Sequence, residues 1–596
     1  MKIWFYIGSS PEYQPKIKYT VDLFFSIYGL KCEYMDSGKT DIKSLIAKDD
    51  LLMVYDKIER LEFFRELAKD NFDLFYLIDL FAEIYSGQFP PSFKNLKNKE
   101  TGEKTPILFD LPVTDKNELC STETKENKTY SGITWREDKN IEAVFYGDLV
   151  ASSFYFLTLQ EEIRSDKKDK HGRFKALFSF RKEKNLIDFP LVNSYFKLIL
   201  DLIQKRFSKR NLPLMRKSFW PGGVPLAVVL THDVDILDKW LGYALFRGVQ
   251  LLIKGRVRDF FLLLGKMLTS ILKKKNPALS FAFLRQIEKG LNFGSTFFFL
   301  AGKPKFKSML KSDITYDITR ERNKAILKNI KSDLHEVGLH GSYESFSDDQ
   351  KVKEEKNLLE SSLGDSINGI RQHFLRFAYP QTWHIQENLG FLYDCSLGYP
   401  DASGFKSGLA FPFYPYDDST DKIVKVLQLN TNVMDQTYVK YKKQNLMNMK
   451  QEIYEILTRV EQSGGLVNLL WHTSVVDEFA FFGFMRAYQE ILNYLKHKKA
   501  FVSSGKRIAI WWRKRENLIL LSSLISEKNV FEWEYMSGDL LDKATLELYF
   551  TDADKYHIRA ENIDIKAGMK KDFVLVELSG LKPNQKFKIS LHKKDE

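Results

Sequence analysis

The feature that most constrains this 596-residue chain is a set of apolar runs that each lead into ionisable side chains. In the first, PLAVVLTHDVDIL, a strand-like pattern runs directly into Asp233 and Asp235. Residues two apart point to the same side of an extended strand, so both carboxylates would face one way. In parallel β/α sheets and barrels, catalytic groups gather at the carboxyl ends of the strands. The segment therefore predicts one edge of an active site.

Three later strand-like runs place charged or metal-competent side chains in the same manner. HEVGLH ends in His340, IRQHFLRF carries Arg371, His373 and Arg376, and LVNLLWH ends in His472. A single histidine after a strand is usually structural, and a single arginine usually forms an ion pair or lies at the surface. The ordered set is harder to explain in that way, and it indicates a shared site.

In this order, THDVD, HEVGLH, IRQH and LLWH resemble the motifs of the polysaccharide deacetylases, the nodulation-deacetylase homology group of carbohydrate esterases. The stretch from Gly390 to Gly408 resembles the segment that follows the family's arginine motif. The resemblance covers about half of the chain. It implies an incomplete, distorted (β/α) barrel with the site at the carboxyl ends of the strands. It also implies a hydrolase that removes an acyl group, typically N-acetyl, from a carbohydrate or glycoconjugate by metal-assisted attack of water.

The resemblance also implies a role for each matching residue. Asp233 would be the general base, Arg371 would orient its carboxylate, and His472 would protonate the leaving nitrogen. Asp235 and His340 would bind a divalent metal ion, with zinc as the first candidate.

The metal motif departs from the family pattern at one position. The family usually has a second histidine four residues after the first, and here that position is Glu344. A carboxylate is an ordinary ligand of catalytic zinc, so Glu344 is one candidate for the third ligand, and His373 is another. Loss of tight metal binding is the third alternative. The chain could then be a catalytically silent, deacetylase-like protein that binds carbohydrate or acts as a scaffold.

Side chains near these motifs are candidates for contact with a sugar. Trp383, Phe405 and Trp471 have aromatic faces that could stack on a sugar ring, although core packing explains them equally well. Arg376 is a candidate polar contact. Asp435, which follows a short apolar run, could line the same cleft.

The flanking regions predict two further domains. Residues 1–215 alternate strand-like and amphipathic segments, which indicates an α/β domain with a recognition or scaffold role. Proline and glycine interrupt the pattern just before a strong strand, which places the start of the catalytic domain at residue 221. That domain is expected over 221–516. Residues 517–596 alternate apolar and polar side chains between turn signals and predict a small β-rich domain.

Composition excludes several classes of protein. Three cysteines, Cys32, Cys120 and Cys395, are too few and too scattered for a disulfide framework or a zinc ribbon. The formal charge of +12 is spread over interleaved acidic and basic residues, and no nucleic-acid-binding motif accompanies it. The N-terminus lacks the pattern of a signal peptide, and no apolar run approaches the ~18 residues of a membrane span. We therefore expect a cytoplasmic protein without a nucleic-acid partner.

A long helical segment from Trp240 to Lys275 has apolar runs flanked by basic residues. A basic amphipathic helix can lie on a membrane surface. We favour the alternative, a helical hairpin that packs on the domain and keeps its basic ends in solvent. The oligomeric state is not indicated by the sequence.

Overall fold

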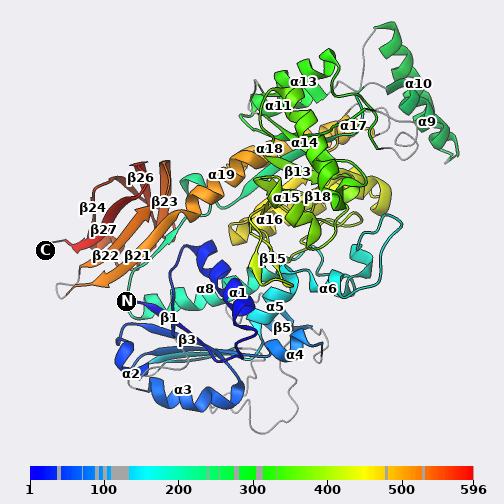
Figure 1. Ribbon diagram of the computed structural model, residues 1–596. Coiled ribbons are helices and arrows are strands. Elements are labelled where there is room, and N and C mark those ends of the chain that lie inside the picture. The colour runs from blue at the N-terminus through cyan, green and yellow to red at the C-terminus, as the bar shows by residue number, and fades with distance from the viewer. Residues whose placement is uncertain are drawn as a thin grey trace.

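The computed structural model shows three parts, each built around its own β-sheets (Figure 1). The structure describes residues 1–35, 42–69, 71–87, 93–97, 104–108, 133–137, 139–237, 240–253, 255–273, 281–303, 313–331, 333, 335–476, 481–526 and 530–594. Within these ranges, no helix combines the length and the apolarity that crossing a membrane requires.

The N-terminal part contains a six-stranded sheet in the order β2-β1-β3-β4-β8-β7. Its strands are β1 (Ile3–Ile7), β2 (Glu33–Met35), β3 (Leu51–Asp56), β4 (Asp73–Ile78), β7 (Ile133–Glu137) and β8 (Ile141–Phe145). The strands are parallel apart from β7, and every residue of β3 and β4 is buried, as in sheets covered on both faces. Helix α3 (Leu61–Ala68) covers one face, and α1 (Gln14–Tyr28), α5 (Leu149–Leu157) and α8 (Leu191–Lys209) cover the other (Figure 1).

The middle part contains a nine-stranded parallel sheet in the order β17-β14-β13-β12-β11-β10-β19-β18, with β20 also paired to β10. The strands are β10 (Ala227–Val234), β11 (Thr296–Leu300), β12 (Glu336–Gly341), β13 (Gly369–Gln372), β14 (Tyr393–Asp394), β17 (Leu427–Gln428), β18 (Thr431–Met434), β19 (Leu466–Leu470) and β20 (Phe501–Ser503). The end strands β17 and β18 follow each other in the chain but are not paired with each other. The sheet is therefore a parallel half-barrel, which is consistent with the incomplete, distorted barrel that the family resemblance implies.

Helices pack on the outside of the half-barrel. They include α11 (Phe281–Gly290), α13 (Glu321–Lys331), α14 (Asp349–Leu363), α15 (Gln381–Asn388), α16 (Leu446–Ser463), α17 (Thr473–Val476), α18 (Phe484–His497) and α19 (Gly505–Glu516). Strand β10 alternates between two environments. Val228 and Leu230 belong to the cluster that contains buried residues of α11, α13, α14, α16 and α18, whereas Val229 packs in the cluster that contains Phe298 of β11. Because Thr231 and Asp233 share the side of Val229, their polar groups lie on the inner face of the sheet.

The C-terminal part contains two antiparallel four-stranded sheets, β21-β22-β27-β24 and β25-β26-β23-β9. Their strands are β21 (Leu518–Ile525), β22 (Phe531–Ser537), β23 (Leu541–Tyr549), β24 (Tyr556–Glu561), β25 (Asp564–Met569), β26 (Val574–Leu581) and β27 (Gln585–Lys593). The eighth strand, β9 (Leu214–Lys217), precedes the middle part in the chain and pairs with β23. The chain therefore passes through a C-terminal sheet, as β9, before it forms the half-barrel. The sequence does not indicate this pairing.

Buried Arg515 at the end of α19 joins all three parts. Its guanidinium donates hydrogen bonds to the carbonyl oxygens of Ser26 and Ile27 in α1, and to those of Lys217 and Ser218 beside β9. A buried cation requires such partners, because desolvation without them is very costly. The half-barrel is therefore held at a defined position against the N-terminal part.

Candidate active site

Four parallel strands of the half-barrel bring the predicted residues to one of its edges. Asp233 lies near the end of β10, with Asp235 just beyond it, and His340 lies in β12. Arg371 lies in β13, and His472 follows β19 after one residue. The carboxyl ends of parallel strands meet at one edge of a sheet, which explains how residues up to 239 positions apart in the chain converge.

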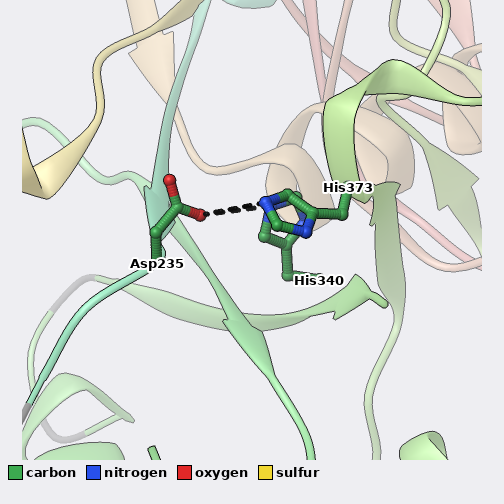
Figure 2. A group of neighbouring side chains, drawn as sticks. All are labelled: Asp235, His340 and His373. Atoms are coloured by element: carbon green, nitrogen blue, oxygen red, sulfur yellow. Dashed lines mark ion pairs between the residues drawn. The ribbon is translucent and has the colours of Figure 1, made fainter. Parts of the chain in front are cut away.

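Asp235, His340 and His373 form a group that could hold a metal ion (Figure 2). Their candidate ligand atoms all lie within 4.8 Å of one another. Oδ1 of Asp235 is 3.5 Å from Nε2 of His340 and 3.8 Å from Nε2 of His373. This oxygen is buried, and it accepts no hydrogen bond from the residues that the structure describes. A buried carboxylate oxygen aimed at two imidazole nitrogens suits a cation, so the donor set fits a divalent metal such as zinc.

Both imidazoles are oriented through their second ring nitrogen. Nδ1 of His340 donates to the carbonyl oxygen of Arg371 over 2.8 Å, and Nδ1 of His373 lies 3.2 Å from Oδ1 of Asp313. These contacts leave Nε2 of each ring free to act as a ligand, and such partners set the tautomer of metal-binding histidines. Asp313 lies in a segment without helical or strand periodicity, and no signal in the sequence points to it.

Asp233 is held as an ionised carboxylate by Arg371. Nη1 of Arg371 donates to Oδ1 of Asp233 over 2.8 Å, and the guanidinium also donates to the hydroxyl groups of Thr231 and Thr431. Burial alone would raise the pKa of Asp233. The charges of Arg371, His340 and His472 outweigh burial and hold this pKa below its usual value. The free oxygen Oδ2 lies 3.6 Å from Nε2 of His340 and 3.8 Å from Nε2 of His472.

His472 is paired with Asp435, which directly follows β18, the strand that pairs with β19. Nδ1 of His472 lies 2.6 Å from Oδ1 of Asp435, and the backbone N–H of His472 donates to Oδ2 over 2.8 Å. Burial lowers the pKa of this imidazole, but the carboxylate of Asp435 more than offsets that effect and raises the pKa of His472 to about 9. His472 is therefore an imidazolium at neutral pH, with Nε2 directed toward Asp233.

Glu344 lies apart from this group. Its carboxylate is 3.1 Å from the guanidinium of Arg376, and its side chain is 53% exposed. Arg376 also donates to the carbonyl oxygens of Tyr343 and His171 and stacks over the ring of Phe346. Glu344 pairs with Arg376 and is not part of the metal-competent group, which corrects the expectation that it is a ligand. Arg376 holds backbone segments together, and its contact with a substrate stays a prediction.

The three aromatic residues expected to contact sugar are buried. Trp383, Phe405 and Trp471 are each 2% exposed or less. Trp471 packs against Tyr488 of α18, and Trp383 packs against Phe377 and Tyr379. They are core residues without a free ring face, so the expectation that they stack on a sugar is wrong.

A segment that precedes the half-barrel contributes to the rim of the site. The ring of His171 stacks on Phe374, the residue after His373, and its Nδ1 lies 3.0 Å from the hydroxyl of Tyr343. Arg173 donates to the carbonyl oxygen of Phe374 over 2.9 Å. The sequence shows no active-site signal in the first 215 residues, because this segment has neither a motif nor a strand pattern.

One family model matches the N-terminal third of the chain. Residues 6–208 match the model of a family of unknown function, DUF7033. No curated protein matches the chain.

Several solved structures resemble about half of the chain. A protein from Mycobacterium smegmatis assigned as a polysaccharide deacetylase is 18% identical, with 49% of this chain and 92% of that chain covered and a TM-score of 0.33. A CE4 family pseudoenzyme from Bacillus anthracis is 12% identical, with coverages of 48% and 65% and a TM-score of 0.24. The catalytic domain of a peptidoglycan N-acetylglucosamine deacetylase from Eubacterium rectale is 11% identical, with coverages of 48% and 90% and a TM-score of 0.23. At these scores the likeness carries no conclusion about the activity of this chain.

Replacement of His373 with alanine should show whether His373 or Glu344 is the third metal ligand. Loss of one of three protein ligands is expected to weaken Zn²⁺ binding by roughly 100-fold or more, measured by isothermal titration calorimetry on metal-free protein. Glu344→Ala is the matched control and should bind Zn²⁺ as the unsubstituted protein does. If Glu344→Ala weakens binding while His373→Ala does not, the loop carboxylate is the ligand.

Proposed function

We propose that this chain is a hydrolase that removes an acyl group, typically N-acetyl, from a carbohydrate or glycoconjugate. The observation that carries the proposal is the position of Asp233, whose free oxygen lies between a metal-competent group and an imidazolium. Cleavage of an amide by water needs a base for the water, stabilisation of the oxyanion and an acid for the leaving nitrogen. In the described site, Asp233 is suited to the first task and His472 to the third. Asp235, His340 and His373 would hold a metal ion for the second.

Asp235, His340 and His373 are the residues that would hold the divalent ion, with zinc as the first candidate. When bound there, such an ion polarises an acyl carbonyl and lowers the pKa of water from about 15.7 toward about 7. The protein's part is to hold the three ligand atoms in one place, through the contacts of Nδ1 in His340 and His373.

Asp233 is proposed to accept the proton of the attacking water. Its low pKa keeps it ionised at neutral pH, and Arg371 fixes one oxygen so that the other faces the site. His472 is proposed to donate the Nε2 proton to the departing nitrogen, since its high pKa keeps it charged until that step. General acid–base catalysis of this kind contributes typically about 10²–10⁴-fold to the rate.

The sugar itself is proposed to contact the rim beside His373. Tyr343 and Phe374 are partly exposed there, unlike the buried aromatic residues predicted from the sequence. His171 packs on both rings, so the N-terminal part would shape the entrance to the site.

Asp233→Asn should abolish deacetylation while the fold is retained. An amide cannot accept the water proton, so we expect kcat to fall by about 10²–10⁴-fold on N-acetylated chitooligosaccharides, measured as released acetate. Circular dichroism should be unchanged. Asp349→Asn, an exposed change in α14, is the matched control and should retain full activity. Normal turnover by Asp233→Asn would exclude Asp233 as the base.

Asp435→Asn should shift the alkaline limb of the pH–rate profile. The proposed acid must be protonated, so kcat/KM falls as pH rises through the pKa of His472, which Asp435 raises to about 9. Removal of that negative charge lowers this pKa, and the limb should move to lower pH by roughly one unit or more. A profile with lower rates but an unmoved limb would show that Asp435 has only a structural role.

A further inference from the structure

A helical hairpin is inserted between Asp235 and strand β11. It consists of α9 (Trp240–Ile253) and α10 (Val257–Leu272), which project from one end of the molecule (Figure 1). Because β10 ends at Val234, the hairpin leaves the half-barrel at the strand edge that carries the candidate active site. Lys266 of α10 contacts the ring of Phe482, just before α18, with Nζ 5.2 Å from the ring centroid.

The two helices bury little of their apolar surface. Ala244 and Leu251 of α9 pack with Leu263 and Met267 of α10 in a cluster of their own. Among the side chains of the hairpin that the structure describes, most of the other large apolar ones are exposed. Twelve of the 25 exposed large hydrophobic residues recorded for the described chain lie on this hairpin. The expectation that the hairpin packs its apolar side on the domain is therefore not met.

The exposed residues follow helical spacing on both helices. They are Leu241, Leu245, Val249, Leu252 and Ile253 on α9, and Val257, Phe261, Leu262, Leu264, Leu268, Ile271 and Leu272 on α10. Ile253 beside the tip is 80% exposed, and Leu272 at the other end of α10 is 82% exposed. Large exposed apolar patches on single chains mark sites of protein or membrane contact.

The same segment concentrates positive charge. Residues 240–275 contain eight lysines and arginines and one acidic residue, Asp259. Their net charge of +7 is more than half of the chain's +12, although they are a small fraction of its 596 residues. Arg256 and Arg258 are exposed at the tip of the hairpin, beside Val257.

We propose that the α9–α10 hairpin docks on the surface of an anionic phospholipid membrane. Amphipathic helices with a basic polar face lie in the interface with their apolar side at the boundary between head groups and acyl chains. Each lysine or arginine near an anionic surface adds to the affinity. The exposed leucine, isoleucine and phenylalanine side chains provide the apolar contact, and the basic residues provide the attraction to lipid head groups.

The charge of the hairpin favours a lipid surface over a second copy of the chain. Two hairpins in contact would bring together two surfaces that each carry +7, and like charges at close range repel. An anionic membrane has the complementary sign. Docking through this hairpin would also bring the active-site edge of the half-barrel toward the membrane, since the hairpin begins five residues after Asp235.

Vesicle co-sedimentation of the full chain tests the proposal. We expect binding to vesicles of phosphatidylcholine and phosphatidylglycerol, and weak binding to vesicles of phosphatidylcholine alone. The double variant Leu245→Gln, Phe261→Gln should lose about tenfold or more in affinity for the anionic vesicles. Arg256→Gln with Arg258→Gln should lose affinity for the anionic vesicles and leave binding to neutral ones unchanged.

Met447→Gln with Met569→Gln is the matched control, because both side chains are as exposed as those on the hairpin but lie elsewhere. This variant should bind the anionic vesicles as the unsubstituted protein does. Sedimentation velocity without lipid should show that the hairpin variants leave the oligomeric state unchanged. Absence of binding to anionic vesicles would overturn the proposal. So would a dimer that the hairpin variants convert to a monomer, since the occupant would then be a second copy.

Discussion

The buried ion pair between Asp233 and Arg371 is the interaction on which the rest of the site depends. Arg371 lies inside the half-barrel, over the ring of Phe298, and its guanidinium connects β10, β13 and β18 through Asp233 and two threonine hydroxyl groups. The positive charge of the buried guanidinium favours the charged form of its carboxylate partner, so the packing of the sheet interior holds Asp233 ionised. The free oxygen of Asp233 then faces His340 and His472, and the acid–base geometry follows from the packing of the sheet interior.

Two elements outside the sheet of the half-barrel lie next to the candidate site. The first element is the segment around His171, which packs on the turn that carries His373 and Phe374. The region matched by DUF7033 therefore contributes side chains to the rim of the site. The second element is the α9–α10 hairpin, which begins five residues after Asp235. The core of the site is built from the half-barrel, whereas its access and surroundings are set by elements outside it.

The position of Asp233, Asp235 and His472 at the carboxyl ends of strands could be predicted from the sequence, because each follows an apolar run whose direction sets the edge of the sheet. It leaves the third ligand open, since His373 lies beyond β13 in a turn where Phe374 has a φ of 61°, and local patterns do not encode where such a turn directs a ring. Local periodicity also does not show which distant strands pair, so the pairing of β9 with β23 of the C-terminal part could not be predicted. Burial of Trp471 depends on its contact with α18, which the sequence does not specify.

The most direct test of the central claim is the release of acetate from N-acetylated chitooligosaccharides by the zinc-loaded full chain, followed by proton NMR. The account predicts acetate well in excess of the protein concentration, together with the free amine, and loss of this activity when a chelator removes the metal. Stoichiometric zinc binding and oligosaccharide binding without any acetate would contradict it, and would identify the chain as a carbohydrate-binding protein with a silent site.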